Sequence, residues 1–458
     1  MVTEKNMKVK KLDNGLRYLV TGDMCPKNRK TAIILYMNTG SIYENENERG
    51  VSHFIEHLYF NGTCSPNTNK TKIKNNQKMS MKKCRCNYFE IFKEIDNYGG
   101  EMNAYTDKDH TAFHMKIPNK YLSNGLNLLS DIIQNTYITK EKIEKEKGIV
   151  IEELNTVKSD SEDFVQNKLF KMMFGNNTLG YDMIGGRKYI LNYNIRTIKN
   201  YIKKFYRPDN AHIVVSTNMK QNKIDCYIKQ YFSNFKPQTK NSLIKPQLQP
   251  IPKQLEPKIR FCDDHDSNCI ITMGYVICGY NSLDKYPLRL LSYIIGEMYS
   301  SRLFINLREN NGLVYDVDSG AYFYKDYGVF LISCQMDCKN TNKVIKIILQ
   351  VIKDITSYGI QIEELKSAKN KLIQDYLDKD DDVESSANEY GMQMVYNDYI
   401  LPLSKITKQI KVIPKKSVEA MAHKYLDISN LNIIVSGKSN KKLIKDIIIN
   451  FEEKTKLV

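Results

Sequence analysis

The chain has 458 residues, 41% of them hydrophobic and 26% charged, and its formal net charge is +16. These are values of a globular protein, and the length predicts two or more domains that each bury a core. No apolar run is long enough to span a bilayer, which argues against a membrane-spanning protein. The positive charge would suit nucleic acid or another anionic partner. Lysine and asparagine are abundant throughout the chain, however, so we give this charge little weight. A function in binding nucleic acid or an anionic surface would rest on charge alone.

The first informative element is a predicted helix that carries His53, Glu56 and His57. Positions i, i+3 and i+4 share one face of a helix, so both imidazoles and the carboxylate point the same way. Two imidazoles one turn apart suit zinc, whose catalytic sites use a third protein ligand and leave one position open. The order His-x-x-Glu-His is typical of the inverzincins, with the glutamate as candidate general base. The alternative is a packed helix in which these residues meet by chance.

The next segment, about residues 66–88, is rich in lysine and asparagine and poor in apolar residues, which predicts a solvated loop. Cys84 and Cys86 fall within it, and a metal site or nucleic-acid patch there is the weaker alternative. The 10 cysteines of the chain show no paired spacing. This favours reduced thiols in an intracellular protein over a disulfide framework.

Residues 99–105 and 111–117 predict a β-hairpin near the zinc helix. An exposed strand edge in this hairpin could bind a peptide as an added strand. Such binding favours unfolded peptides over folded proteins as substrates.

A long helix is predicted from Thr139, its candidate N-cap. Glu146 and Glu153 lie about two turns apart on this helix and therefore share a face. Glu153 is the candidate third zinc ligand, and Glu146 would orient a histidine from behind it. Glu152 is the rival ligand, but it lies about a hundred degrees around the helix from Glu153.

Two segments with the pattern of buried strands, 210–218 and 430–438, repeat one another. Between them, residues 237–257 hold five of the chain's 12 prolines, which predicts an extended linker. We therefore expect two homologous α+β domains, 1–236 with the zinc motif and 258–458 without it. Each would be a mixed β-sheet packed with helices. One continuous sheet is the alternative that the linker disfavours.

Motifs spread over nearly the whole chain resemble the pitrilysin/insulinase family of zinc metallopeptidases. Within that family they are most similar to the β subunit of the mitochondrial processing peptidase and its bacterial relatives. The segments that carry the resemblance are 11–17, 39–50, 53–63, 99–106, 146–154, 179–185 and 300–315. The resemblance implies zinc ligands at His53, His57 and Glu153, and a catalytic base at Glu56. It also implies two domains that face each other across a peptide-binding chamber.

The resemblance further implies substrate contacts at Asn103, Tyr105, Arg308 and Tyr315. Without it, Arg308 and Tyr315 are an ordinary surface arginine and a packed tyrosine. The stretch between the zinc helix and the long helix is longer than is usual in the family. This extra length leaves the predicted ligands unchanged but puts the family's arrangement at the rim of the site in doubt. The remaining histidines lack the spacing of metal ligands and are expected to be structural: His110, His114, His212, His265 and His423.

The sequence thus predicts a zinc-dependent endopeptidase, with one Zn²⁺ per chain, that hydrolyses unfolded peptides or presequence-like segments. Zinc lowers the pKa of its bound water, and Glu56 would accept the proton and return it to the leaving amine. A non-catalytic structural or regulatory subunit is the alternative, although such subunits usually have broken zinc motifs. Relatives of this length form dimers, so we expect a homodimer or a heterodimer with a related subunit. The N-terminus shows no apolar leader, which predicts an intracellular, cytoplasmic protein.

Overall fold

The computed structural model describes residues 7–22, 29–64, 85–159, 161–237, 248, 250–262 and 268–456. Most of the expected solvated loop, Cys84, His265 and part of the proline-rich linker lie outside these residues. The described residues form two β-sheets in two compact units. Unit 1 comprises 1–154, 182–246 and 378–402, and unit 2 comprises 155–181, 247–377 and 403–458.

The six strands of unit 1 form a mixed sheet in the order β1-β2-β6-β3-β5-β4. Their bounds are Lys10–Lys11 (β1), Arg17–Gly22 (β2), Lys30–Met37 (β3), Glu101–Thr106 (β4), Thr111–Pro118 (β5) and Ala211–Thr217 (β6). The central strands β3 and β6 are buried along nearly their whole length, and each carries a run of apolar residues, because helices cover both faces of the sheet. The expected hairpin is confirmed as β4 and β5, with Asn103 opposite His114, and β4 is the edge strand.

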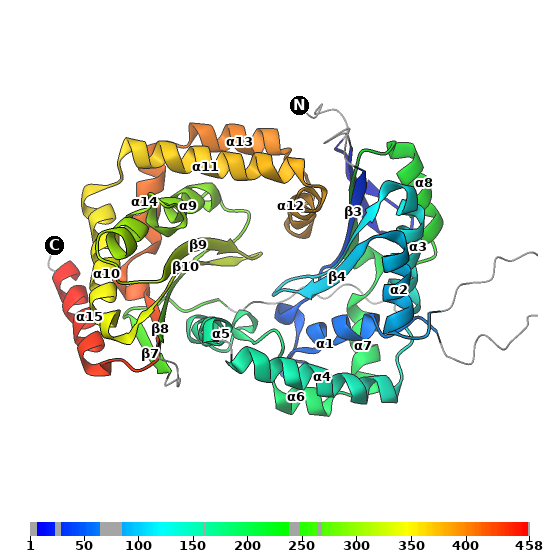
Figure 1. Ribbon diagram of the computed structural model, residues 1–458, viewed down its shortest axis with the longest axis horizontal. Helices are drawn as coiled ribbons and strands as arrows, with labels where there is room; N and C mark the ends of the chain where they lie inside the picture. The colour runs from blue at the N-terminus through cyan, green and yellow to red at the C-terminus, as the bar shows by residue number, and fades with distance from the viewer. Residues whose placement is uncertain are drawn as a thin grey trace, which may run out of the picture. The chain divides into compact units, whose positions relative to one another are not determined.

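Helices α3 and α8 pack on one face of this sheet, and α12 packs on the other (Figure 1). The helices of unit 1 are Val51–Tyr59 (α1), Tyr88–Tyr98 (α2), Leu122–Asn135 (α3), Lys140–Ser159 (α4), Arg187–Asn192 (α6), Ile195–Phe205 (α7), Gln221–Phe232 (α8) and Val383–Tyr396 (α12). The last residues of α4 belong to unit 2. Helix α1 lies against the hairpin strands β4 and β5, which places the zinc motif beside the sheet edge.

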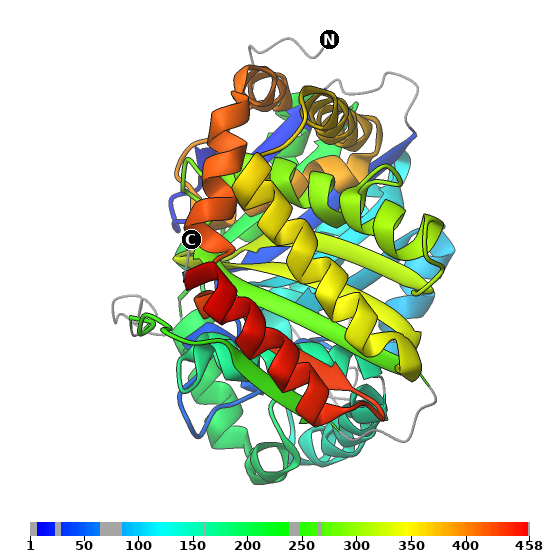
Figure 2. The ribbon, with the colours of Figure 1, turned by 90° about the vertical axis from the view of Figure 1, so that its left-hand side faces the viewer.

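Unit 2 repeats this architecture with a five-stranded sheet in the order β7-β11-β8-β10-β9. Its strands are Lys258–Cys262 (β7), Asn268–Cys278 (β8), Asp316–Phe323 (β9), Tyr327–Asp337 (β10) and Asn432–Ser436 (β11). Its helices are Ser161–Phe174 (α5), Lys285–Ser292 (α9), Thr341–Tyr358 (α10), Ile362–Asp381 (α11), Leu403–Val412 (α13), Lys415–Tyr425 (α14) and Lys441–Lys456 (α15). The last residues of α11 belong to unit 1. Figure 2 shows α10 and α15 side by side on this unit, where they pack together.

The repeated segments of the sequence occupy equivalent places in the two sheets. Strand β6 pairs parallel with β2 and antiparallel with β3. Strand β11 pairs parallel with β7 and antiparallel with β8. The expectation of a mixed sheet with helices in each half is therefore confirmed, and the described residues form two sheets instead of one continuous sheet.

One helix of each unit comes from the other half of the sequence, and we call these two the exchanged helices. Helix α12 comes late in the sequence but packs on β3 and β6 of unit 1, whereas α5 comes early and packs on β8 and β11 of unit 2. The apolar side of α12 is buried there through Val383, Ala387, Tyr390 and Met394. The compact units thus differ from the linear division at 1–236 and 258–458, because side-chain burial and not chain order decides which sheet a helix covers.

The cysteines give a further difference from the sequence-based expectation. Cys269 at the start of β8 and Cys338 after β10 form a disulfide, with their Cα atoms 4.8 Å apart. The expectation that all thiols are reduced is therefore wrong for this pair. The two cysteines meet because β8 and β10 are antiparallel neighbours, with Cys269 opposite Met336. Among the described residues, no helix combines the length and apolarity needed to cross a membrane.

Candidate metal centre and active site

Helix α1 is positioned by its first turn. Its N-cap is Gly50, at φ 83°, where a Cβ atom would lie only 2.2 Å from the carbonyl oxygen of Ile184. Glycine cannot cap a helix with a side chain, and the buried Glu44 does so instead by accepting hydrogen bonds from the backbone N–H groups of Gly50 (2.7 Å) and Ser52 (2.9 Å). The apolar face of the helix is fully buried through Val51, Phe54, Ile55 and Leu58.

The structure brings His53, His57 and Glu153 together. His53 Nε2 lies 3.3 Å from Glu153 Oε1, and His57 Nε2 lies 3.3 Å from Glu153 Oε2. One ligand atom from each residue lies within 4.8 Å of the others, as a metal ion would require. Glu153 reaches this site from α4, whereas its neighbour Glu152 is exposed.

Glu146 holds His57 from behind. Its Oε1 lies 3.0 Å from His57 Nδ1, which leaves Nε2 directed at the candidate metal position. Asn61, one helical turn beyond His57, donates to Glu146 Oε2 at 2.7 Å and fixes this carboxylate in turn. Carboxylates commonly orient metal-binding histidines in this way.

Glu56 lies on the same helix and is only 8% exposed. Thr106, at the end of β4, donates a hydrogen bond of 2.6 Å to Glu56 Oε2. Burial raises the pKa of Glu56, although the two histidines and this hydrogen bond act in the opposite direction. A carboxylate with a raised pKa and one oxygen held in place suits a general base.

The carboxylates of Glu146 and Glu153 make this site favourable for a cation. Burial disfavours the ionised form of Glu153, but hydrogen bonds to both imidazoles outweigh burial and hold its pKa well below its usual range. Burial likewise disfavours the imidazolium of His57, yet the hydrogen bonds to Glu146 and Glu153 raise its pKa to about 10. The two carboxylates that face His57 thus favour a positive charge between them.

The three residues fit zinc by chemistry and by spacing. Two imidazoles and one carboxylate form a donor set used by catalytic zinc. Ligands about 2.0–2.1 Å from a tetrahedral zinc ion lie roughly 3.4 Å from each other. Here each imidazole Nε2 lies 3.3 Å from one of the two oxygens of Glu153, and one ligand atom from each of the three residues lies within 4.8 Å of the others. Among the described residues, the buried Nδ1 of His53 lacks a hydrogen-bond partner.

The candidate substrate residues divide between the two units. Asn103 and Tyr105 lie on the edge strand β4, two positions apart and therefore on the same face. Arg308 and Tyr315 belong to unit 2, where Arg308 is exposed above the ring of Phe304 and Tyr315 is 60% exposed just before β9. His110, His114 and His212 lie outside the metal group, and each makes a hydrogen bond within unit 1.

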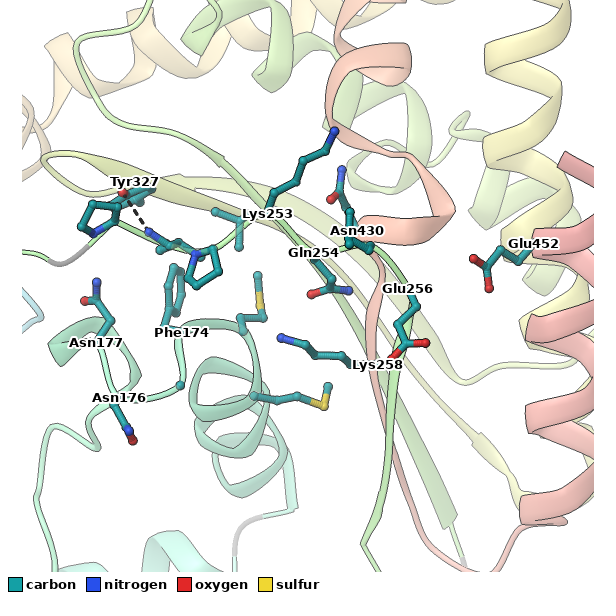
Figure 3. A pocket seen from close by; sticks show the side chains of 18 residues that line it. Phe174, Asn176, Asn177, Lys253, Gln254, Glu256, Lys258, Tyr327, Asn430 and Glu452 are labelled. Carbon is teal, nitrogen blue, oxygen red and sulfur yellow. Dashed lines mark hydrogen bonds between the residues drawn. The ribbon is translucent and has the colours of Figure 1, made fainter. Parts of the chain in front are cut away.

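A large cavity lies within unit 2. It has a volume of about 1110 Å³ and is lined by the end of α5, by residues 250–256 and by parts of the second sheet. Figure 3 shows Phe174 and Asn177 on one side of it and Gln254 and Lys258 on another. None of the predicted site residues lines it, so volume alone does not locate the chemistry of this chain.

Sequence reasoning missed the residues that hold the site together. Thr106 ends the motif at 99–106, but the hydrogen bond that it makes to Glu56 depends on how β4 lies beside α1. Asn61 follows His57 by one helical turn, a spacing that could have placed it on the same side of the helix. Glu44 lies within the motif at 39–50, but its role as the cap of α1 could not be foreseen because it is not adjacent to the helix.

Two family models match adjoining parts of the chain. One, described as insulinase (peptidase family M16), matches residues 23–87 and 76–187, and the other, described as the peptidase M16 inactive domain, matches 192–372. An uncharacterized zinc protease of Rickettsia felis is 27% identical over 433 residues, which cover 94% of this chain and 98% of the relative. The mitochondrial-processing peptidase subunit beta of Mus musculus is 23% identical over 423 residues, covering 91% and 81%.

The fold has a close counterpart among solved structures. A protease from Helicobacter pylori matches with a TM-score of 0.84 at 20% identity, covering 94% of this chain and 99% of the other. The first family model contains the helix with the zinc motif, and the second covers most of the half without it. The motif and the two adjoining family matches show that this chain belongs to the insulinase family of peptidases, family M16.

Proposed function

We propose that the chain is a zinc-dependent endopeptidase that cleaves extended peptides. The proposal rests mainly on the arrangement around α1, where His53, His57 and Glu153 converge and Glu56 lies on the same helix with one oxygen fixed by Thr106. The family and the zinc proteases among its relatives point the same way. His53, His57 and Glu153 would hold one Zn²⁺, which when bound acts as a Lewis acid and lowers the pKa of water.

Glu56 would act as the general base. Because Thr106 occupies Oε2, the other oxygen, Oε1, remains to take up a proton from the attacking water and to return it to the leaving amine. Burial keeps the pKa of this carboxyl above its ordinary value, which makes both proton transfers easier near neutral pH. Glu146 keeps His57 oriented while the charge at the site changes.

The edge of β4 would bind the peptide. An edge strand presents unpaired backbone N–H and C=O groups, and an extended peptide can pair with them as an added strand. Asn103 and Tyr105 would then contact alternate side chains of the substrate. The assignment of Arg308 and Tyr315 as further substrate contacts rests on the family resemblance of 300–315, where both are exposed.

Replacement of the base tests this function. We expect Glu56→Gln to retain zinc, since Glu56 is not a ligand, while hydrolysis of a quenched peptide library falls by about 10²- to 10⁴-fold. Glu152→Gln is the matched control: it makes the same charge change at an exposed position next to Glu153 and should leave both properties unchanged. A zinc-loaded wild-type protein that cleaves no peptide would instead support a non-catalytic subunit.

We also propose that the chain associates with a related subunit. The observation behind this is the likeness to a mouse protein named as a subunit of a processing peptidase. Co-purification from the native source followed by mass spectrometry tests the proposal. Recovery of a second insulinase-family chain supports a heterodimer, and recovery of this chain alone at monomer mass contradicts it.

A further inference from the structure

The exchanged helix α12 reaches the edge strand through one exposed amide, that of Asn388. Asn388 Oδ1 accepts a hydrogen bond of 3.2 Å from the hydroxyl of Tyr105 on β4 and one of 2.7 Å from the hydroxyl of Tyr36 on β3. Tyr36 is fully buried under α12, so the surrounding core holds its side chain in place. Tyr105 is thereby connected to the interior of the sheet by a residue 283 positions later in the chain.

The ring of Tyr105 is also held from the side. It packs against His110 at 5.5 Å and His114 at 6.1 Å between ring centroids. His114 in turn bonds Glu384 of α12 at 2.8 Å. Burial raises the pKa of Tyr105 to about 12, although a hydrogen bond with Tyr36 acts in the opposite direction, so the protonated hydroxyl can donate to Asn388.

This anchoring acts on the strand that carries the site. Tyr105 and Thr106 are consecutive residues of β4, so their side chains point to opposite faces. Tyr105 is held by α12 on one face, while Thr106 holds Glu56 on the other. A peptide added to β4 would direct alternate side chains toward α12 and Tyr105.

We infer that Asn388 is a positioning residue for the peptide, acting through Tyr105, and that α12 forms part of the substrate site. The inference rests on the proposed peptidase function and on peptide pairing with β4. Asn388 is not needed to attach α12, because other contacts do so: a buried apolar side, His212 Nε2 with Gly391 O at 3.1 Å, and Arg17 with Met394 O at 2.8 Å. Its loss should therefore affect substrate binding more than stability.

Steady-state kinetics on the full chain test the inference. We expect Asn388→Ala to raise KM about five-fold, the effect of one or two lost neutral hydrogen bonds, with little change in kcat. Both bonds are accepted by Oδ1, so Asn388→Asp, which keeps an acceptor at that place, should restore the KM of the wild type. Asn397→Ala, at the end of the same helix and away from β4, is the matched control. Zinc content and thermal stability should stay near wild type in all three.

A double-mutant cycle separates positioning from a general effect on the fold. If Asn388 acts through the Tyr105 hydroxyl, Asn388→Ala should add nothing to Tyr105→Phe. Binding is measured by anisotropy of fluorescein-labelled β-casein with chains that also carry Glu56→Gln, so that this arm does not depend on turnover. Additive effects, an Asn388→Asp protein as weak as Asn388→Ala, or unchanged binding by Asn388→Ala would overturn the inference. Absence of hydrolysis by the wild type would instead contradict the proposed function. The binding measurement would still test the role of Asn388, because it does not depend on turnover.

Discussion

The hydroxyl of Thr106 orients Glu56, the candidate base. It donates its only proton to Glu56 Oε2, and the facing Thr111 donates to the carbonyl oxygen of Thr39 instead. Hydrogen bonds to charged groups contribute more than neutral ones, about 1.5–3 kcal/mol. The position of Glu56 thus depends on a strand residue that is not part of the zinc motif.

Replacement of Thr106 by the isosteric valine should lower kcat by about ten-fold or more, because Glu56 loses the hydrogen bond that orients it. Thr106→Ser keeps the hydroxyl and should remain near wild type. Zinc content, measured by metal analysis, should be equal in both variants since neither residue is a ligand. A valine variant with the kcat of the wild type would show that burial alone positions Glu56.

At the scale of elements, the start of α1 depends on Glu44. Burial raises the pKa of this carboxyl to about 7, although the hydrogen bonds from Ser52 and Gly50 lower it. Its ordinary value is about 4.5. The folded state therefore binds the proton more tightly than the unfolded state. The resulting stability is fully present below pH 4.5 and is lost as the pH rises through 7.

The stability difference between wild type and Glu44→Gln should therefore change with pH. As the pH rises from about 4.5 to about 8, the wild type should lose on the order of 2–3 kcal/mol relative to the variant, which has no group to ionise there. Urea unfolding of both chelator-treated proteins at several pH values measures this difference. A difference that stays constant across that range would show that Glu44 does not titrate in the folded protein.

The helix exchange decides how the chain can be divided. A fragment 1–236 lacks α12, so the apolar sheet face over β3 and β6 would be exposed, and it carries an α5 that has lost its sheet. We expect 1–236 and 237–458 each to aggregate when expressed alone, and to co-purify in soluble form when expressed together. Solubility and co-purification from one tagged fragment provide the measurement.

Tyr390→Asp in the second fragment is the control for that experiment. Tyr390 is buried on α12 and belongs to unit 1. A buried charge there should abolish co-purification. Soluble, zinc-binding 1–236 on its own would show that the first sheet does not need α12.

At the scale of the whole molecule, Arg308 and Tyr315 test whether unit 2 takes part in cleavage. Arg308 and Tyr315 are exposed in unit 2, so Arg308→Ala and Tyr315→Phe should leave thermal stability and zinc content near wild type. If they contact the peptide in the transition state, kcat/KM should fall by about ten-fold or more. Lys325→Ala, an exposed change in the turn after β9, is a suitable control. Unchanged kcat/KM in both variants would mean that unit 2 serves only as a scaffold.

The sequence by itself determined what depends on local spacing. The zinc motif lies on a helix because its apolar residues recur at helical intervals, and the hairpin follows from two short strands joined by a tight connection. The repeated strand segments were recognisable because each is buried on both faces and carries a run of apolar residues, 213–215 in one and 433–435 in the other. Glu153 could be preferred over Glu152 because only Glu153 shares a helix face with Glu146.

The tertiary structure alone decided the contacts between distant segments. That α12 covers the first sheet and α5 the second, that Asn388 meets Tyr105, and that Cys269 pairs with Cys338 could not be read from local patterns. An amphipathic helix specifies that one face must be buried, but its sequence does not state which sheet will bury it. Glu44 and Thr106 are likewise ordinary polar residues in the sequence, and only the packing around α1 makes them a helix cap and a hydrogen-bond partner of the candidate base.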